Sequence, residues 1–169
     1  MPQIAVIGMS SFGYYLARTL TEKGGKVLVI DSDEAKIDAV KGYVTKAVVG
    51  DATDIRVLRQ LGVMNMNSVV ISLGSKLDSS ILVAMHLKEL NVKNVVAKAM
   101  TEDHAKILEI IGVKRVIFPE KDMAVRIAHS LLGSNIADYV PLSSDLSIAE
   151  VIPLKEMVGK SLLELNFRK

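Results

Sequence analysis

Two segments of the chain have the residue types and the spacing to hold a nucleotide. A strand-like run, Ile4–Ile7, leads into Gly8–Gly13 (Gly-Met-Ser-Ser-Phe-Gly), and a second apolar run, Val27–Ile30, ends on Asp31. A glycine lets the backbone turn sharply out of a strand, and the following helix directs free N–H groups and its positive dipole end at a phosphate. Asp31 comes 23 positions after Gly8, close to the roughly 20 at which an acid binds the ribose hydroxyls.

Ser10 stands where the middle glycine of that pattern is expected. Its side chain crowds a pyrophosphate pressed against the backbone, although serine is small and its hydroxyl can donate to a phosphate oxygen. The string Gly-x-Ser-x-x-Gly alone is a weak signal, and the alternative is a tight turn that holds no ligand. The strand before it, the helix after it and Asp31 in register favour nucleotide binding.

Further polar residues are expected at the carboxyl edge of the same sheet, where doubly wound folds bind ligands. Asp51 can accept a hydrogen bond from an adenine amino group; alternatively, Asp51 or Thr53 caps the next helix. The glycine of Ser72–Gly74 permits close backbone approach to a ligand or forms an ordinary turn. Lys98 can meet a phosphate or is a solvated lysine, and Glu120 opens a long helix, where an acid suits the helix dipole in any case.

Alternating strand and helix signals predict the elements that position these residues. The strand candidates are short, continuous runs rich in Val, Ile and Ala, which indicates strands buried on both faces of a parallel sheet. They are Gln3–Ile7, Lys26–Asp31, Thr45–Val49, Ser68–Ser72, Asn94–Lys98 and Arg115–Phe118. Six strand–helix units of this kind predict an α/β fold, a Rossmann-like doubly wound parallel sheet with the strand order 3-2-1-4-5-6.

Polar residues ahead of the amphipathic stretches predict helix N-caps. We expect Asp33 or Ser32 to cap the helix after the second strand, and Thr101 to cap the helix after the fifth. The helix after the third strand is expected to be capped by Thr53 or Asp51. Three glycines are placed to end helices: Gly24, Gly62 and Gly112.

The composition narrows the function classes. With 169 residues, 50% hydrophobic and 24% charged, the chain has an ordinary globular composition that suits one domain and a small addition. The net charge is +2 with scattered cations and 4% aromatics, which does not support nucleic-acid binding. Without cysteine there is no disulfide or thiolate metal site. No signal peptide is visible and no run approaches the roughly 20 apolar residues of a membrane span, so we expect a cytoplasmic protein.

A long helix is predicted from Pro119 to about residue 133, and Gly133–Asn135 ends it. Its apolar face is wide for a helix that only covers a sheet, so it forms either a self-association surface or sheet cover. We therefore assign residues 1–135 to the Rossmann-like domain and residues 136–169 to a linker and the beginning of a second domain.

The second segment predicts a strand at Ser147–Pro153 and a turn with a short helix at Gly159–Leu165. Some 30 residues are too few for an independent core. We expect further sequence or another subunit to complete this domain.

Catalytic patterns are missing from the sequence. The 34 residues after Asn135 do not make a substrate domain, and no Tyr-x-x-x-Lys pair occurs. A nucleophile elbow would need glycine where Phe12 stands, and there is no Walker P-loop. A nucleotide site without catalytic groups favours a sensor whose ligand biases a conformational or assembly equilibrium, rather than an enzyme.

An ordered set of motifs extends along essentially the whole chain: Ile4–Gly8 with Gly13, Val29–Glu34, Gly50–Thr53, Val96–Ala99, Val116–Ala124 and Pro153–Leu162. Together they resemble the regulatory subunits of Trk/Ktr-type potassium uptake systems, which carry RCK domains (regulators of potassium conductance). The glycine turn alone is not specific to this family, but the order of several motifs is.

The resemblance implies dimers that assemble into octameric rings on the cytoplasmic side of a membrane potassium-translocating subunit. A bound adenine nucleotide (AMP, ADP or ATP) or NAD(H) would change the ring and gate transport. The helix from Pro119 would be the crossover helix, about 119–133, that joins two protomers. Glu120 would lie near the dimer interface, close to the phosphates.

By the same resemblance, Gly8–Gly13 would face the phosphates, Asp31 would hold the ribose, Asp51 and Ala52 would contact the adenine, and Ser72–Gly74 would line the pocket. The candidate binding residues are Gly8, Met9, Ser10, Ser11, Phe12, Gly13, Asp31, Ser32, Asp51, Ala52, Thr53, Ser72, Leu73, Gly74, Lys98 and Glu120. No metal site is expected.

Two departures from the family pattern concern the phosphates. Ser10 replaces the middle glycine, and Ser11 stands where Ktr-type members often carry an arginine that grips the terminal phosphates. A hydroxyl does not replace a bidentate arginine–phosphate contact. The preference for ATP over ADP or AMP is therefore open, as is whether the ring contains one kind of chain or two.

We interpret the chain as a non-enzymatic, nucleotide-binding regulator of potassium transport. One alternative is a small NAD(P)-dependent oxidoreductase fragment, which would need a substrate domain beyond Lys169. The other is a Rossmann-like scaffold that binds no nucleotide and makes only the assembly contacts in a mixed ring.

Overall fold

The computed structural model describes residues 1–132, 136–141 and 146–166. The chain divides into two compact units, Met1–Phe118 and Pro119–Lys169, and each is described by itself. None of the helices in the described ranges is long and apolar enough to cross a membrane. The predicted domain boundary after residue 135 stays a prediction.

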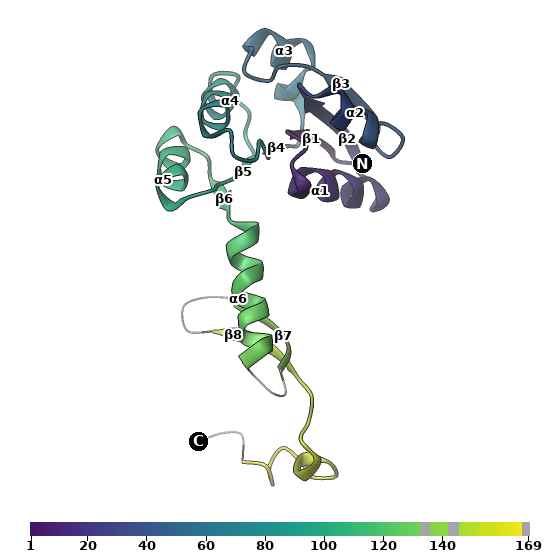
Figure 1. Ribbon diagram of the computed structural model, residues 1–169, viewed down its shortest axis with the longest axis vertical. Helices are drawn as coiled ribbons and strands as arrows, with labels where there is room; N and C mark the ends of the chain where they lie inside the picture. The colour runs from purple at the N-terminus through teal and green to yellow at the C-terminus, as the bar shows by residue number, and fades with distance from the viewer. Residues whose placement is uncertain (133–135, 142–145, 167–169) are drawn as a thin grey trace. The chain divides into compact units, whose positions relative to one another are not determined.

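The first unit is a six-stranded parallel sheet with helices packed on both faces (Figure 1). The strands are β1 (Gln3–Ile7), β2 (Lys26–Asp31), β3 (Lys46–Val49), β4 (Ser68–Ile71), β5 (Val95–Lys98) and β6 (Arg115–Ile117). Their order, β3-β2-β1-β4-β5-β6, confirms the predicted doubly wound topology. The order reverses between β1 and β4, and ligands of such folds bind at the carboxyl ends of the strands beside that point.

The connections between these strands are helical. They are α1 (Ser11–Glu22), α2 (Glu34–Val40), α3 (Ile55–Gln60), the 3₁₀ helix η1 (Val63–Asn65), α4 (Leu77–Glu89) and α5 (Glu102–Ile111). Four strands are one residue shorter than predicted, because Thr45, Ser72, Asn94 and Phe118 lie just outside them.

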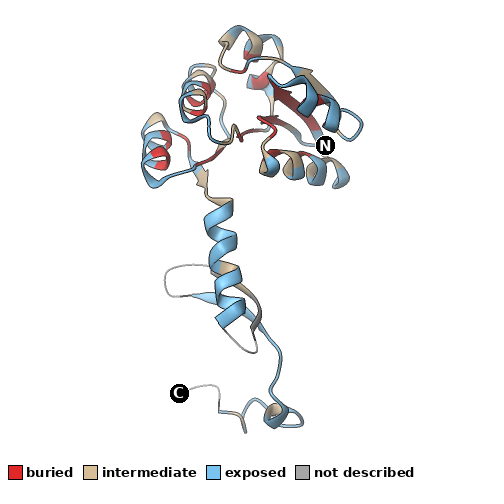
Figure 2. Cartoon of the chain, in the orientation of Figure 1, coloured by how far each residue is buried: buried red, intermediate tan, exposed pale blue. Residues whose placement is uncertain are grey.

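Successive residues of the central strands enter two separate cores. Val6 packs in a cluster with Ile37 of α2 on one face, whereas Ile7 joins Leu87 of α4 and Leu108 of α5 on the other. Side chains alternate between the faces of a strand, so a strand buried on both sides requires a continuous apolar run. Figure 2 shows this burial along the strands and on the helices around them.

Helix caps follow the sequence prediction with one exception. The carboxylate of Asp33 accepts from Ala35 N at 3.0 Å, and the hydroxyl of Thr101 accepts from His104 N at 3.1 Å. The prediction of Thr53 or Asp51 for α3 is wrong, because Asp54 is the cap and accepts from Arg56 N at 2.9 Å. The Arg56 side chain also donates to Asp54 and lowers the pKa of this carboxyl to about 2.

The second unit consists of α6 (Pro119–Leu132), the antiparallel strands β7 (Ile136–Pro141) and β8 (Ser147–Val151), and the 3₁₀ helix η2 (Lys155–Met157). Residues 158–159 and 162–166 form turns, so the short helix predicted at Gly159–Leu165 is wrong for the described residues. The predicted helix break at 133–135 lies outside the described residues. No residue of α6 is buried, and β8 is exposed along its whole length (Figure 2).

Candidate functional site

The turn between β1 and α1 requires glycine at both of its ends. Gly8 has φ +92°, and a Cβ there would lie 2.5 Å from the carbonyl oxygen of Ser72. A Cβ on Gly13 would lie 2.2 Å from the carbonyl oxygen of Gly8. These distances are far below van der Waals contact, so any side chain would push α1 away from the ends of β1 and β4. The glycines therefore bring the start of α1 against the carboxyl edge of the sheet.

Ser10 is the N-cap of α1. Its Oγ accepts from Gly13 N at 3.4 Å and lies 2.6 Å from the Oγ of Ser72, so the two hydroxyls share a hydrogen bond. The side chain at the position of the missing middle glycine is thus directed to the end of β4. The first turn of the helix still presents backbone N–H groups, including those of Ser11 and Phe12, that have no intrahelical partner.

Asp31, at the end of β2, is tied to this turn. Its Oδ2 accepts from Met9 N at 2.6 Å and its Oδ1 accepts from Asp33 N at 2.9 Å. The residue is only 8% exposed. Each carboxylate oxygen has a second lone-pair direction, so the group retains acceptor capacity for hydroxyl donors while it fixes the turn. The strand tip and the glycine turn thus form one hydrogen-bonded unit.

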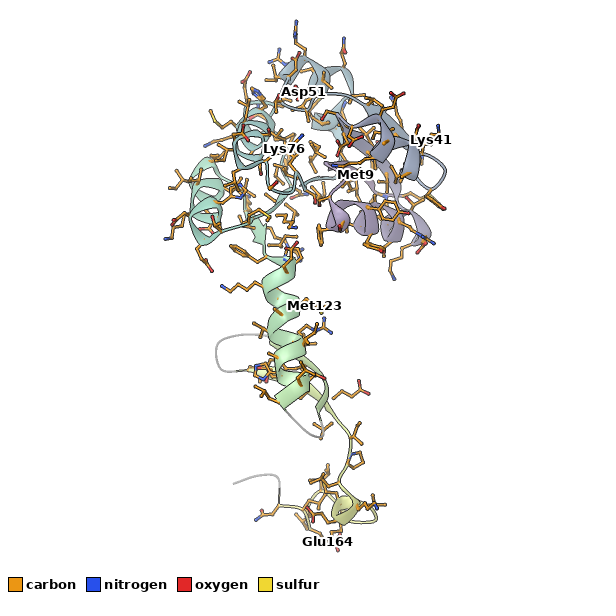
Figure 3. All side chains as sticks on the ribbon, viewed as in Figure 1. Met9, Lys41, Asp51, Lys76, Met123 and Glu164 are labelled. Carbon is orange, nitrogen blue, oxygen red and sulfur yellow. The ribbon has the colours of Figure 1, made fainter. Side chains whose placement is uncertain are left out.

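A narrow cleft of about 30 Å³ lies at this edge of the sheet. Its lining brings together three segments predicted separately: Asp31 and Ser32 at the end of β2, Asp51 to Thr53 after β3, and Leu73 after β4. The rest of the lining consists of Ile7, Ile30, Gly50, Lys76 and Ser79. Met9, Asp51 and Lys76 are labelled in Figure 3.

Asp51 forms a local turn with Thr53. Its Oδ1 accepts from both the hydroxyl of Thr53, at 2.7 Å, and the backbone N–H of Thr53, at 2.9 Å. The hydroxyl bond is the main cause that lowers the pKa of this carboxyl. The carbonyl of Thr53 in turn lies 3.1 Å from His86 Nε2. Asp51 is thus an ionised acceptor at the mouth of the cleft, next to the buried Ala52.

The remaining predicted residues divide into three groups. Ser72 is fully buried at the end of β4, and Gly74 beyond it has φ +64°. Lys98 is 7% exposed at the end of β5 and is absent from the lining of the cleft. Glu120 lies in the first turn of α6, in the second unit. The structure brings the first group to the glycine turn, and the roles predicted for Lys98 and Glu120 stay predictions.

The sequence did not predict several residues that line the two clefts, among them Lys76, Ser79 and Lys36. Lys76 and Ser79 line the narrow cleft, and Lys36 lines a second cleft that also contains Met9, Ser10 and Ser11. Lys76 follows Gly74 by two positions, which was an available signal. Lys36 had none, because only the packing of α2 beside α1 brings it there. Among the described residues, no group of three or more histidines, cysteines or carboxylates is arranged to hold a metal ion.

The sheet order and the glycine turn define a Rossmann-like domain. More closely, the chain belongs to the TrkA-N domain family, whose model matches residues 4–119. It is 38% identical to the Ktr system potassium uptake protein C of Bacillus subtilis and 40% identical to protein A of the same organism. Each alignment covers 98% of this chain and 75% of the relative.

Two solved structures share the fold. The NAD(P)-binding domain of an exopolyphosphatase-related protein from Archaeoglobus fulgidus superposes with a TM-score of 0.69 at 23% identity, over 78% of this chain and 98% of the other. The Kef CTD of Shewanella denitrificans in its AMP-bound form has a TM-score of 0.64 at 22% identity, over 78% and 82% of the two chains.

Proposed function

We propose that this chain is a regulatory subunit of a potassium uptake system, which binds an adenine nucleotide or NAD(H) and controls a membrane potassium-translocating subunit of Trk/Ktr type. The observation that carries the proposal is the unit formed by the glycine turn and Asp31, joined by the 2.6 Å hydrogen bond from Met9 N to Asp31 Oδ2. The similarity to two Ktr system potassium uptake proteins, over 98% of this chain and 75% of each relative, supports the transport context.

In this proposal the ribose hydroxyls donate to Asp31, and a phosphate lies on the N–H groups and positive dipole end of α1. The adenine lies over the cleft beside Asp51 and Ala52, with Leu73 on the side of β4, and the cleft has to widen from its volume of about 30 Å³ to admit the ring. One structural neighbour is an NAD(P)-binding domain and the other is in an AMP-bound form, which supports an adenosine-containing ligand for this fold. Binding then acts as a signal, because a ligand that prefers one conformation shifts the equilibrium toward it.

We further propose that the protein works as a dimer within a larger ring on the cytoplasmic side of its membrane partner. α6 supports a dimer contact, since Met123, Ile127 and Leu131 are 48%, 50% and 80% exposed. Apolar side chains gathered on one helix are a common self-association surface. In this arrangement α6 is the crossover helix that joins two protomers, and Glu120 lies near the dimer interface, close to the phosphates.

The first test is calorimetric titration of the purified chain with AMP, ADP, ATP and NAD. Asp31→Ala should weaken binding by roughly 1–3 kcal/mol, because hydrogen bonds to a charged acceptor are lost. Asp38→Ala, which removes only the exposed partner of Lys41, is the matched control and should bind normally. Circular dichroism of both variants verifies that the turn change has not unfolded the domain.

The second test concerns control of transport. The chain is co-expressed with a Trk/Ktr-type translocating subunit in a host that lacks its own potassium uptake. We expect uptake to depend on the wild-type chain and to be lost or deregulated with Asp31→Ala, whereas Asp38→Ala behaves as wild type. Uptake that is identical with and without the chain would contradict the regulatory role.

A further inference from the structure

A second cleft adjoins the glycine turn, between the first turns of α1 and α2. It has a volume of about 290 Å³ and is lined by Met9, Ser10, Ser11 and Tyr14 on one side and by Lys36 on the other. The amino end of α1, where the proposed function puts a phosphate, therefore opens directly onto a space with a lysine on its far wall. Lys36 contributes the single charged side chain among the lining residues.

Lys36 differs from two neighbouring cations, which are each paired with a carboxylate. Arg18 of α1 is paired with Glu22 at 2.8 Å, and Lys41 after α2 is paired with Asp38 at 2.8 Å. The side chain of Lys36 makes no hydrogen bond or ion pair with any residue in the described part of the chain. Its side chain is exposed, so its ammonium group can turn toward an anion without breaking an existing contact.

The turn itself supplies no side-chain charge for a polyphosphate. Gly8–Gly13 contains no Lys or Arg, and Ser10 already shares its hydroxyl with Ser72. The N–H groups and the dipole of α1 favour a phosphate placed within the first helical turn. Each further phosphate adds negative charge, which a cationic side chain stabilises through a charge-assisted hydrogen bond.

We propose that Lys36 holds the terminal phosphates of the bound nucleotide and thereby makes the site prefer ADP and ATP over AMP. The inference rests on the proposed nucleotide site and adds to it the residue that sets its phosphate preference. A lysine acts as a compact point charge without the fixed bidentate geometry of arginine. It therefore separates nucleotides with a second phosphate from AMP more strongly than it separates ATP from ADP.

The test measures the affinity of the full chain for AMP, ADP and ATP by calorimetry at low and at physiological salt. Lys36→Gln should weaken ADP and ATP about tenfold and leave AMP unchanged, since one exposed charge-assisted contact is lost. Lys36→Arg should retain the ADP and ATP affinities. Lys41→Gln, which removes a lysine already paired with Asp38, is the control and should leave all three affinities unchanged.

The outcomes separate this inference from the proposed function. If AMP, ADP and ATP bind the wild-type chain but Lys36→Gln changes none of them, or weakens all three equally, the role of Lys36 is wrong and the nucleotide site stands. If the wild-type chain binds no nucleotide at all, the proposed function itself is wrong. A loss confined to ADP and ATP that diminishes at high salt is the result that the proposal requires.

Discussion

The two units of the chain differ in how far their apolar residues are buried. In Met1–Phe118, alternate strand residues enter cores on both faces of the sheet, and Ile7, Ile30 and Leu108 are fully buried. In the described residues from 119 onward, α6 has no buried residue, and Leu131 and Leu132 are 80% and 88% exposed. The first unit buries the apolar side chains of its strands in its own cores, whereas the second leaves the apolar side chains of α6 exposed.

This difference explains where each function can reside. A completed core holds backbone turns in a fixed geometry, and such a scaffold is required to present the glycine turn and Asp31 to a ligand. When another surface covers the exposed apolar side chains of a helix, the contact is stabilised by roughly 25 cal/mol per Å² of apolar area removed from water. In the proposed function, ligand binding therefore belongs to the first unit and self-association to the second.

The largest effect is expected from a change that breaks the first unit at its turn. Gly13→Ala puts a Cβ 2.2 Å from the carbonyl oxygen of Gly8, and should lower the free energy of unfolding by about 3 kcal/mol or more. Gly42→Ala is the control, because a Cβ there has no atom within 4 Å. Urea denaturation followed by circular dichroism measures both. Equal stability of the two variants would contradict the packing described for α1.

The second unit is tested by charging its apolar helix. Ile127→Glu should convert the proposed dimer into monomers at micromolar concentration, because a carboxylate in an apolar contact loses its hydration. Sedimentation velocity measures the change. Met64→Glu, on η1 of the first unit at 37% exposure, is the control and should leave the assembly intact. Oligomers that persist with Ile127→Glu would reject α6 as the contact.

A smaller effect comes from the buried His104 of the first unit. Burial lowers the pKa of this imidazole below 6.5, its Nδ1 accepts from Met100 N at 3.3 Å, and it is 3% exposed. The unfolded chain therefore binds the proton first as the pH falls. The stability due to neutral His104 is present above pH 6.5 and is lost toward pH 5, at no more than about 1.4 kcal/mol per pH unit.

The measurement is the free energy of unfolding between pH 7.5 and 5. In His104→Asn, whose side-chain oxygen can still accept from Met100 N, that decline should be reduced. A wild-type stability that rises as the pH falls from 7 to 5 would contradict the assignment of His104 as a neutral, buried group.

The smallest change concerns the cap of α1. Ser10→Ala should lower the stability by about 1 kcal/mol, because it removes the acceptor for Gly13 N and leaves the buried hydroxyl of Ser72 with one partner fewer. Ser11→Ala, one position further on and exposed, is the matched control and should cost less. Thermal unfolding distinguishes the two, and equal losses would show that the Ser10–Ser72 contact contributes nothing.

The sheet was predictable because its signals are local. Continuous apolar runs such as Val27–Ile30 arise when a strand is buried on both faces, and the spacing from Gly8 to Asp31 reflects the length of one strand–helix–strand unit. The N-cap of α3 was not predictable, because the two predicted candidates, Asp51 and Thr53, lie beside Asp54, and each of these residue types can cap a helix. The structure uses Asp54, since the carboxylate of Asp51 is already bonded to Thr53.

The rest of the candidate site depends on contacts that are distant in sequence. Ser10 and Ser72 are 62 positions apart. The glycine pattern shows only that Ser10 replaces a glycine, and it does not predict the hydrogen bond between Ser10 and Ser72 at the end of β4. Lys36 lines the cleft beside the glycine turn through helix packing alone. In the second unit, β7 was missed because Ile136–Pro141 includes an aspartate and a proline, which strands disfavour.

The most direct test of the central claim is native mass spectrometry of the purified chain, first without additions and then with ATP. It reports the oligomeric state and any retained nucleotide together. The proposed function predicts dimers or larger assemblies that carry AMP, ADP, ATP or NAD(H), and a loss of the nucleotide mass with Asp31→Ala. A chain that retains no nucleotide before or after the addition of ATP would contradict it.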